Sequence, residues 1–352
     1  MKVLKYLYKT LSVVTVSALA ISCSNDDIEF SNYEGGTTVY FAYQYPVRTI
    51  VLGEDIYDTS LDNEHRCEIY ATMGGVYANK AKINIDFDVA ESLCENLYFE
   101  DGSPVIPMPA NYYSLSDKQI VLNKTMMGAV GVQLQDAFFT DPKSLSKTYV
   151  IPLLLTNVQN ADSILAGRRL IEVAPRTYAA GWDIQPQDYV LYCLKFINSW
   201  HGYYLRRGLD QITEGGVTGN NIRHAQSVEK DEVCNLKTAS LNTVNYPVST
   251  TYTVVGSDGK AVTKTLACDL LLNFNDKNEC SIVSKTEGVT ATGTGKFVLK
   301  GDKNSWGNKD RNVLYLEYKI DFGTKQSVTK DTLVVRDRGI AAEWFSPVYK
   351  QN

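Results

Sequence analysis

Hydrophobic and polar residues alternate along most of the chain after Thr37, and this alternation predicts an all-β protein. Residues 82–89 show the pattern most clearly, with apolar side chains at odd positions and polar ones at even positions, as in a strand with one buried face. About seven short strands within about 140 residues favour an immunoglobulin-like β-sandwich over residues 37–175. These strands are expected at residues 37–43, 66–71, 82–89, 119–122, 130–134, 148–155 and 170–173.

A second series of strands follows and predicts an antiparallel barrel over residues 176–352. Asp258 and Gly259 stand between two β-rich runs, which is a strong hairpin signal, and residues 275–278 predict another tight turn. Because successive hairpins close most simply into an up-and-down barrel, a lipocalin- or calycin-like fold is expected. Pro175 and the Ala-Ala-Gly run that ends at residue 181 mark the boundary between the two domains.

The N-terminal segment has the pattern of a cleaved export signal. Three lysines precede an apolar run at residues 11–21, and no acidic residue lies among them. The run is much shorter than the roughly 20 residues that span a bilayer as a helix. Residues 1–22 are therefore predicted to be a signal peptide.

The residues at the end of this segment resemble a bacterial lipobox. Ser22 precedes Cys23, although Ala20 stands where such motifs usually have leucine. The resemblance implies that Cys23 is acylated and attaches the protein to outer-membrane lipid. The following Ser-Asn-Asp-Asp run is similar to the export tag of Bacteroides-type surface lipoproteins, which implies that the protein faces the cell exterior. The alternatives are an ordinary signal peptide and a solvated tether; residues 23–36 are polar enough to be disordered in either case.

A second resemblance concerns the two domains. The run Met-Pro-Ala-Asn-Tyr-Tyr-Ser-Leu at residues 108–115, followed by Tyr-Val-Ile-Pro-Leu at residues 149–153, resembles an N-terminal domain of unknown function. That domain occurs in Bacteroides surface lipoproteins from polysaccharide-utilisation loci, and it also precedes the catalytic barrel of some family 18 endo-β-N-acetylglucosaminidases. A calycin-like domain with a stretch similar to residues 200–208 often follows it in the lipoproteins. The resemblance supplies no catalytic residues.

Charge and composition narrow the classes of partner. Removing residues 1–22 takes three of the 35 basic residues and none of the 40 acidic ones, which leaves a formal net charge of −8. No basic run is present, so nucleic acid is not an expected partner. The 23 tyrosines suit half-buried β-surfaces, and they also suit surfaces that face sugars.

Six cysteines remain after Cys23, and none forms a CxxC pair or a spacing typical of zinc or iron–sulfur sites. An exported protein can form disulfides, but Cys193 and Cys268 lie in apolar runs. Buried free thiols are therefore the favoured interpretation.

Motifs of enzymes are mostly absent. The chain has no GxSxG, HExxH or P-loop motif, and its three histidines share no short spacing. Asp302, Asn304 and Gly307 mimic part of a calcium loop, but Trp306 occupies a ligand position, so a polar turn is expected. We expect no catalytic residues, no metal site and no cofactor, although 40 acidic residues leave a glycosidase pair open.

The favoured candidates for glycan binding are Trp200, Tyr204, Arg206 and Trp306. Aromatic rings stack on the C–H faces of sugars, and guanidinium groups bind hydroxyls and carboxylates. The alternative is that residues 200–207 form a strand, in which Trp200, Tyr204 and Arg206 share one face. Trp306 lies on a polar loop and is expected to be the most exposed tryptophan, whereas Trp344 is expected to pack.

These patterns predict a lipid-anchored surface protein that binds glycan without cleaving it. It would assist capture of polysaccharide or glycoprotein glycan beside a neighbouring transporter or hydrolase. A structural or adhesin-like component that binds a protein is the alternative, followed by a glycoside hydrolase.

Overall fold

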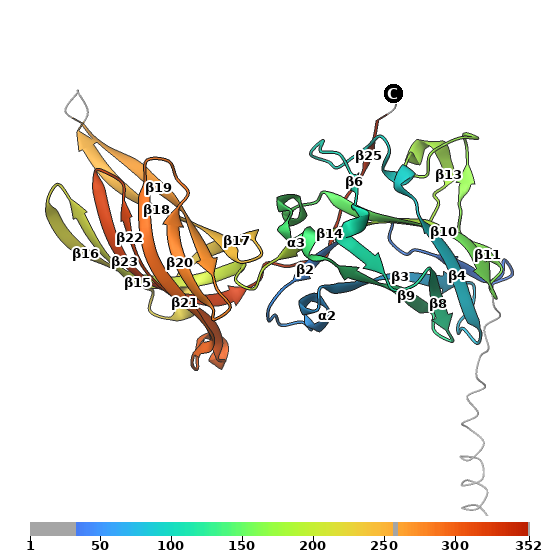
Figure 1. Ribbon diagram of the computed structural model, residues 1–352, viewed down its shortest axis with the longest axis horizontal. Coiled ribbons are helices and arrows are strands. Elements are labelled where there is room, and N and C mark those ends of the chain that lie inside the picture. The colour runs from blue at the N-terminus through green and yellow to red at the C-terminus, as the bar shows by residue number, and fades with distance from the viewer. Residues whose placement is uncertain (1–32, 256–259, 351–352) are drawn as a thin grey trace, which may run out of the picture.

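The computed structural model describes residues 33–255 and 260–350. The protein is all-β, with two curled sheets in its N-terminal half and a closed eight-stranded antiparallel barrel in its C-terminal half (Figure 1). The predicted signal peptide, Cys23 and the tether as far as residue 32 lie outside the described residues. Among the described residues, no helix is long and apolar enough to cross a membrane.

The N-terminal half is a sandwich of two sheets. The first sheet has the order β11-β1-β3-β9-β7 and the second β24-β2-β14-β10-β4-β8, with β6 paired to β10. The first sheet comprises β1 (Thr38–Tyr40), β3 (Arg66–Gly74), β7 (Tyr113–Leu115), β9 (Met127–Leu134) and β11 (Ser163–Ile164). The second comprises β2 (Pro46–Val51), β4 (Lys82–Val89), β6 (Ile106–Pro107), β8 (Gln119–Asn123), β10 (Tyr149–Gln159), β14 (Tyr189–Ile197) and β24 (Glu343–Trp344).

Short elements connect and cover the two sheets. Two two-stranded ribbons add to them: β12 (Arg168–Arg169) with β13 (Trp182–Ile184), and β5 (Leu97–Tyr98) with β25 (Val348–Tyr349). Among the described residues, the α-helices are α2 (Ser60–Asn63) and α3 (Asp136–Thr140). In β4, Ile83, Ile85 and Phe87 are buried as the alternation predicted, while Val89 is 42% exposed.

The main core fills the space between the sheets, with residues of β3 and β9 on one side and of β4, β8 and β10 on the other. A smaller core lies on the opposite face of the second sheet, where Phe345 from the end of the chain packs with Val47 and Phe99. The C-terminal segment therefore returns from the barrel and helps to complete the sandwich (Figure 1).

Two sequence-based boundaries need correction. Strand β14 pairs with β10 and, in parallel, with β2, so it belongs to the sandwich, although the predicted boundary placed it in the barrel domain. The chain passes to the barrel at residues 198–201, not at residues 175–176. The strand expected at residues 170–173 is also absent; that segment is irregular, and Val173 is 86% exposed.

The barrel consists of eight strands that close between β15 and β23, and β16 pairs outside this ring. The strands are β15 (Gly202–Glu214), β16 (Val217–Arg223), β17 (Glu232–Ser240), β18 (Thr243–Val255), β19 (Ala261–Phe274), β20 (Glu279–Ser284), β21 (Thr290–Asp302), β22 (Arg311–Asp321) and β23 (Lys325–Asp337). The hairpin signal at Asp258 is consistent with pairing of Val255 and Ala261 beside it. The turn at residues 275–278 is confirmed, since the Asn275 amide donates to the Glu279 carbonyl oxygen and the Glu279 amide donates to Oδ1 of Asn275.

The six cysteines of the described residues are free thiols, as the sequence favoured. Five are buried, and Cys234 is half-buried. Burial raises the pKa of Cys67 to about 12 and likewise that of Cys280. These thiols therefore serve as small core residues and not as nucleophiles.

Candidate functional site

Arg338 bridges the two domains by hydrogen bonds, beside the contact that Leu241 makes with the sandwich core. Arg338, 7% exposed, donates to the carbonyl oxygens of Leu52 and Glu54 at 3.1 and 2.9 Å in the sandwich domain. It also donates to the carbonyl oxygens of Asn198 and His201, both at 2.7 Å, in the segment that enters the barrel. Because these bonds radiate from one planar group, they fix the direction in which the barrel leaves the sandwich.

Other residues of the connecting segment are equally constrained. The fully buried Asn198 donates from its amide to the carbonyl oxygens of Ser240 and Thr243, both at 2.9 Å. Gly53 adopts φ +85°, and a Cβ there would lie 2.8 Å from the Cβ of Ser199. The loop after β2 can approach this segment closely only because residue 53 is a glycine.

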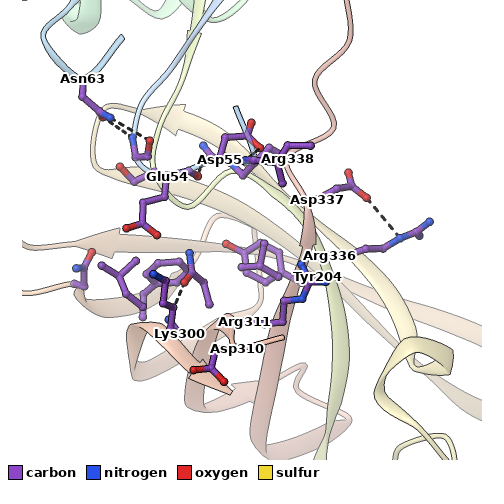
Figure 2. Close-up of a pocket in the computed structure, with 18 residues that line it drawn as sticks. Glu54, Asp55, Asn63, Tyr204, Lys300, Asp310, Arg311, Arg336, Asp337 and Arg338 are labelled. Carbon is purple, nitrogen blue, oxygen red and sulfur yellow. Dashed lines mark hydrogen bonds and ion pairs between the residues drawn. The ribbon is translucent and has the colours of Figure 1, made fainter. Parts of the chain in front are cut away.

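A groove of about 380 Å³ lies between the two domains, beside the junction that Arg338 forms. Figure 2 shows Glu54, Asp55 and Asn63 of the sandwich domain on one side, and Lys300, Asp310 and Arg311 of the barrel on the other. Phe297, Leu299 and Val335 supply apolar surface between them. A concave site with an apolar surface and a few convergent polar groups at a domain interface is a typical place for a ligand.

Two charged side chains of the groove make no ion pair or hydrogen bond within the described part of the protein. Within residues 33–255 and 260–350, the Glu54 carboxylate and the Lys300 ammonium have no ion-pair or hydrogen-bond partner. By contrast, hydrogen bonds from Lys303 and from the Asn304 amide lower the pKa of Asp310. Glu54 and Lys300 are thus free to contact a ligand, and Asp310 is held ionised.

Trp306 lies next to the groove, where its ring contacts the groove residue Arg311. The Arg311 guanidinium lies 3.4 Å from the centre of the Trp306 ring, and its Nε donates to the Trp306 carbonyl oxygen at 3.2 Å. The indole nitrogen donates to the Val335 carbonyl oxygen at 3.2 Å. The ring expected to be the most exposed is therefore half-buried and covered by an arginine, and it positions Arg311 in the groove wall.

The other three predicted glycan-binding residues lie inside the barrel. The Trp200 ring, 7% exposed, stacks on Phe274 with ring centres 4.1 Å apart. The Tyr204 hydroxyl donates to the Trp200 carbonyl oxygen at 2.8 Å, and this side chain is 1% exposed. Arg206 follows on the same face and pairs with Asp331 at 3.2 Å. Tyr204 is among the residues that line the groove (Figure 2), but neither Tyr204 nor Trp200 presents an exposed ring face to a ligand.

The most exposed tryptophan is Trp344, which the sequence assigned to packing. It is 53% exposed and lies beside Tyr43, itself 62% exposed, with ring centres 5.8 Å apart. Trp344 pairs with Pro46 at the start of β2, whose other end leads into the groove at Gly53. Sequence reasoning also missed Arg338 and Glu54, for which no local pattern gives a signal. Within the described part of the chain, no group of three histidine, cysteine, aspartate or glutamate side chains could hold a metal ion.

A half-buried histidine at the junction, His201, makes stability depend on pH. Burial, followed by the charges of Arg338, Lys237 and Lys195, lowers the pKa of His201 from 6.5 to about 4. Its Nδ1 accepts from the Thr238 amide at 3.0 Å. As the pH falls from about 6.5 towards 4, the unfolded state takes up a proton at this position and the folded state does not, so stability decreases.

We therefore expect His201→Asn, which keeps an acceptor near the position of Nδ1, to remove part of the acid sensitivity. Between pH 7 and pH 4.5 the free energy of unfolding of the variant should fall by about 2 kcal/mol less than that of the wild type. Urea unfolding at both pH values measures this difference. His224→Asn, at an exposed histidine, is the control. Equal losses in wild type and His201→Asn would contradict the assignment.

Known domain families and one related protein of known structure match most of the chain. A family model described as Domain of unknown function (DUF5627) matches residues 199–339, which is the barrel, and a second model, described as an N-terminal domain, matches residues 31–162. A search of curated proteins returns no match. The chain is 45% identical to a protein of unknown function from Bacteroides ovatus whose crystal structure is known. That match covers 91% of this chain and 100% of the other, with a TM-score of 0.81.

A multidomain protein including DUF1735, also from Bacteroides ovatus, is 12% identical over 85% of this chain and 96% of the other, with a TM-score of 0.37. The likeness at 45% identity extends over the whole of the first relative. The chain therefore belongs to the family of that Bacteroides ovatus protein of unknown function, with an N-terminal domain followed by the barrel domain DUF5627.

Proposed function

We propose that the protein is a cell-surface lipoprotein that captures glycan, without cleaving it, in the groove between its domains. The observation that carries the proposal is the pair of unpartnered charged groups, Glu54 and Lys300, on facing walls of a groove with apolar surface between them. A sugar has C–H faces that suit apolar surface and a rim of hydroxyls that both donate and accept. The groove offers both kinds of contact.

The groove walls supply the polar partners that a ring of hydroxyls requires. Glu54 accepts, Lys300 donates, and the Arg311 guanidinium is held in a fixed plane by Trp306. The Leu299 side chain, 51% exposed, offers an apolar contact between these groups. Because Arg338 fixes the domains, little conformational freedom is lost when a ligand binds.

The state of Asp310 supports binding over hydrolysis. A glycosidase needs one carboxylic acid with a raised pKa to protonate the leaving oxygen. In the groove, Lys303 and Asn304 lower the pKa of Asp310 instead, which favours the carboxylate as a hydrogen-bond acceptor.

The cell-surface address rests on the N-terminal residues. An apolar run ending at Ser22 and Cys23, with two aspartates shortly after, supports acylation and export to the outer surface. A module anchored in this way gains avidity from neighbouring copies, a transporter or a hydrolase, so each groove can bind weakly.

Removing the two unpartnered charges should abolish capture and leave the fold intact. We expect the double variant Glu54→Gln, Lys300→Gln to bind glycan at least about tenfold more weakly than the wild type, because each charged hydrogen bond contributes about 1.5–3 kcal/mol. Its thermal unfolding should be unchanged, since neither group has an internal partner. Calorimetry with a panel of host and plant glycans measures the effect.

The matched control is the double variant Lys285→Gln, Glu287→Gln, which also removes one charge of each sign. These two residues follow the C-terminal end of β20, whereas the groove residue Asn278 precedes its N-terminal end. It should bind as the wild type does. Absence of glycan binding by the wild type would favour a protein partner at the exposed rim residues Ile56 and Tyr57, which are 83% and 70% exposed. If the protein released shortened glycan fragments during the experiment, it would be a glycoside hydrolase and the capture proposal would be wrong.

A further inference from the structure

The barrel wall has a gap on one side. Strand β15 pairs with β17 only at Gly202–Arg206, and β17 pairs with β18 only as far as Asn245. Beyond those points, β16 has β15 as its partner and β18 has β19, among the described residues. No hydrogen-bond ladder therefore joins β16 to residues 246–255 of β18, and the lumen can be reached from the side.

A cavity of about 160 Å³ lies beneath this gap. Asn221 of β16 and the residues Ser249 and Thr250 of β18 form its mouth, and Arg206, Asp210 and Arg223 line it within the barrel. Lys325 closes one end of the gap, since its ammonium donates to the Thr251 carbonyl oxygen at 2.6 Å. The cavity is separate from the groove between the domains and shares no lining residue with it.

Ion pairs hold the charged walls of the cavity in place. Arg223 pairs with Asp210 at 2.7 Å and with Asp331 at 2.6 Å, and Arg206 pairs with Asp331 at 3.2 Å. Thr329 donates to Asp210 at 2.9 Å. Burial raises the pKa of Asp210, but the hydrogen bonds from Arg223 and Thr329 outweigh it, so its pKa is lowered and the carboxylate stays charged.

One polar group in this network lacks a partner. The Nη1 of Arg223 is buried and has no hydrogen-bond acceptor among the described residues. Its Nε and Nη2 are both occupied by carboxylates. A buried guanidinium N–H without an acceptor is costly, so this nitrogen gains when a ligand oxygen or a water accepts from it.

The balance of charge indicates the class of ligand. Inside the cavity the two guanidinium groups pair with the carboxylates of Asp210 and Asp331, and the more exposed Glu232 lies 3.7 Å from Arg206. Each of these charges already has a partner, so a further charge would enter a partly dehydrated site without a free counterion. A hydroxyl or carbonyl oxygen satisfies Arg223 without that cost. Ile212, Val248 and Ile320 add apolar surface on the other walls.

We propose that the lumen of the barrel binds a small neutral molecule rich in hydroxyls, of about the size of one monosaccharide, which enters between β16 and β18. One ligand oxygen accepts from Nη1 of Arg223, and its C–H face packs on the apolar wall. This site is independent of the groove proposed for glycan capture.

Saturation-transfer NMR and calorimetry on the whole protein test the site with D-galactose, D-mannose and N-acetyl-D-glucosamine. At least one of these neutral sugars should bind. D-Glucuronate and D-glucosamine, which carry a charge, should bind at least about tenfold more weakly. Absence of binding by all three neutral sugars, or equal binding of charged and neutral sugars, would overturn the proposal.

Variants identify the place of binding. Arg223→Lys keeps the positive charge but removes the guanidinium group and with it the Nη1 donor. We therefore expect at least about a tenfold loss of affinity for the sugar. Thr250→Trp leaves every charged residue in place and fills the mouth, so it should also prevent binding if Arg223→Lys fails to fold.

The matched control is Arg207→Lys. This neighbour of Arg206 pairs with the buried Asp231 at 2.6 Å and belongs to the opposite face of β15. It should bind sugar as the wild type does, and so should Glu54→Gln, Lys300→Gln, which separates this site from the groove. Undiminished binding by Thr250→Trp would place the sugar elsewhere and reject the lumen site.

Discussion

Replacing Arg338 with alanine should destabilise the protein by about 3–4 kcal/mol and loosen the connection between its domains. The guanidinium makes four hydrogen bonds, of 2.7 to 3.1 Å, to carbonyl oxygens in both domains. Its removal leaves several buried carbonyl groups without a donor, and each carries a desolvation cost. Urea unfolding should show a lower midpoint, and a nonspecific protease should cleave residues 198–201 faster than in the wild type.

Arg336→Ala provides the control, two residues earlier in the same segment. Its side chain is 51% exposed and pairs with Asp337 at 3.5 Å, so its loss should change stability by less than about 1 kcal/mol. The glycan groove lies between the elements that Arg338 fastens, so Arg338→Ala should also weaken glycan capture. Unfolding and proteolysis equal to those of Arg336→Ala would show that the domains are held by other contacts.

The fold could largely be predicted because strands follow a local pattern. Alternation located β4, the polar residues between two strands located the turn at residues 275–278, and successive hairpins predicted the barrel. The place of β14 could not be predicted in this way. Its parallel partner β2 is about 140 residues earlier in the chain, and no local signal connects the two. Residues 189–197 are apolar on both faces, which indicates a central strand without showing the sheet to which it belongs.

The candidate site was harder to predict because it is assembled from distant segments. The polar loop around Trp306 indicated exposure, but Arg311, five residues later, covers the ring. Trp344 lies in the edge strand β24, which pairs with β2, and only tertiary structure places it there. The cluster at residues 200–207 was correctly interpreted as having two faces, and it is the buried face that carries Trp200, Tyr204 and Arg206.

The second large effect is expected for Asp331, at the centre of the charged network in the barrel. Its carboxylate is fully buried and accepts from the Tyr318 hydroxyl at 2.7 Å, from the Tyr246 hydroxyl at 3.2 Å and from both Arg206 and Arg223. In Asp331→Asn the shape is kept, but the charge is lost and an amide N–H₂ faces these donors. Arg223 then keeps only Asp210 as an ion-pair partner, and Arg206 keeps only the more exposed Glu232 at 3.7 Å.

We expect Asp331→Asn to lower the free energy of unfolding by about 3–5 kcal/mol, as is usual when one partner of a buried ion pair is removed. Adding Arg206→Met to Asp331→Asn removes a guanidinium group that has lost Asp331 as its partner. The double variant should therefore lose about 1 kcal/mol or more less stability than the sum of the losses of the two single variants. Glu317→Gln is the control, because the Glu317–Lys330 pair is 68% and 65% exposed and should contribute less than about 1 kcal/mol. Chemical unfolding of the four proteins and the control measures all of these terms. Additive losses, or a loss for Asp331→Asn no larger than for Glu317→Gln, would show that the network does not hold the barrel together.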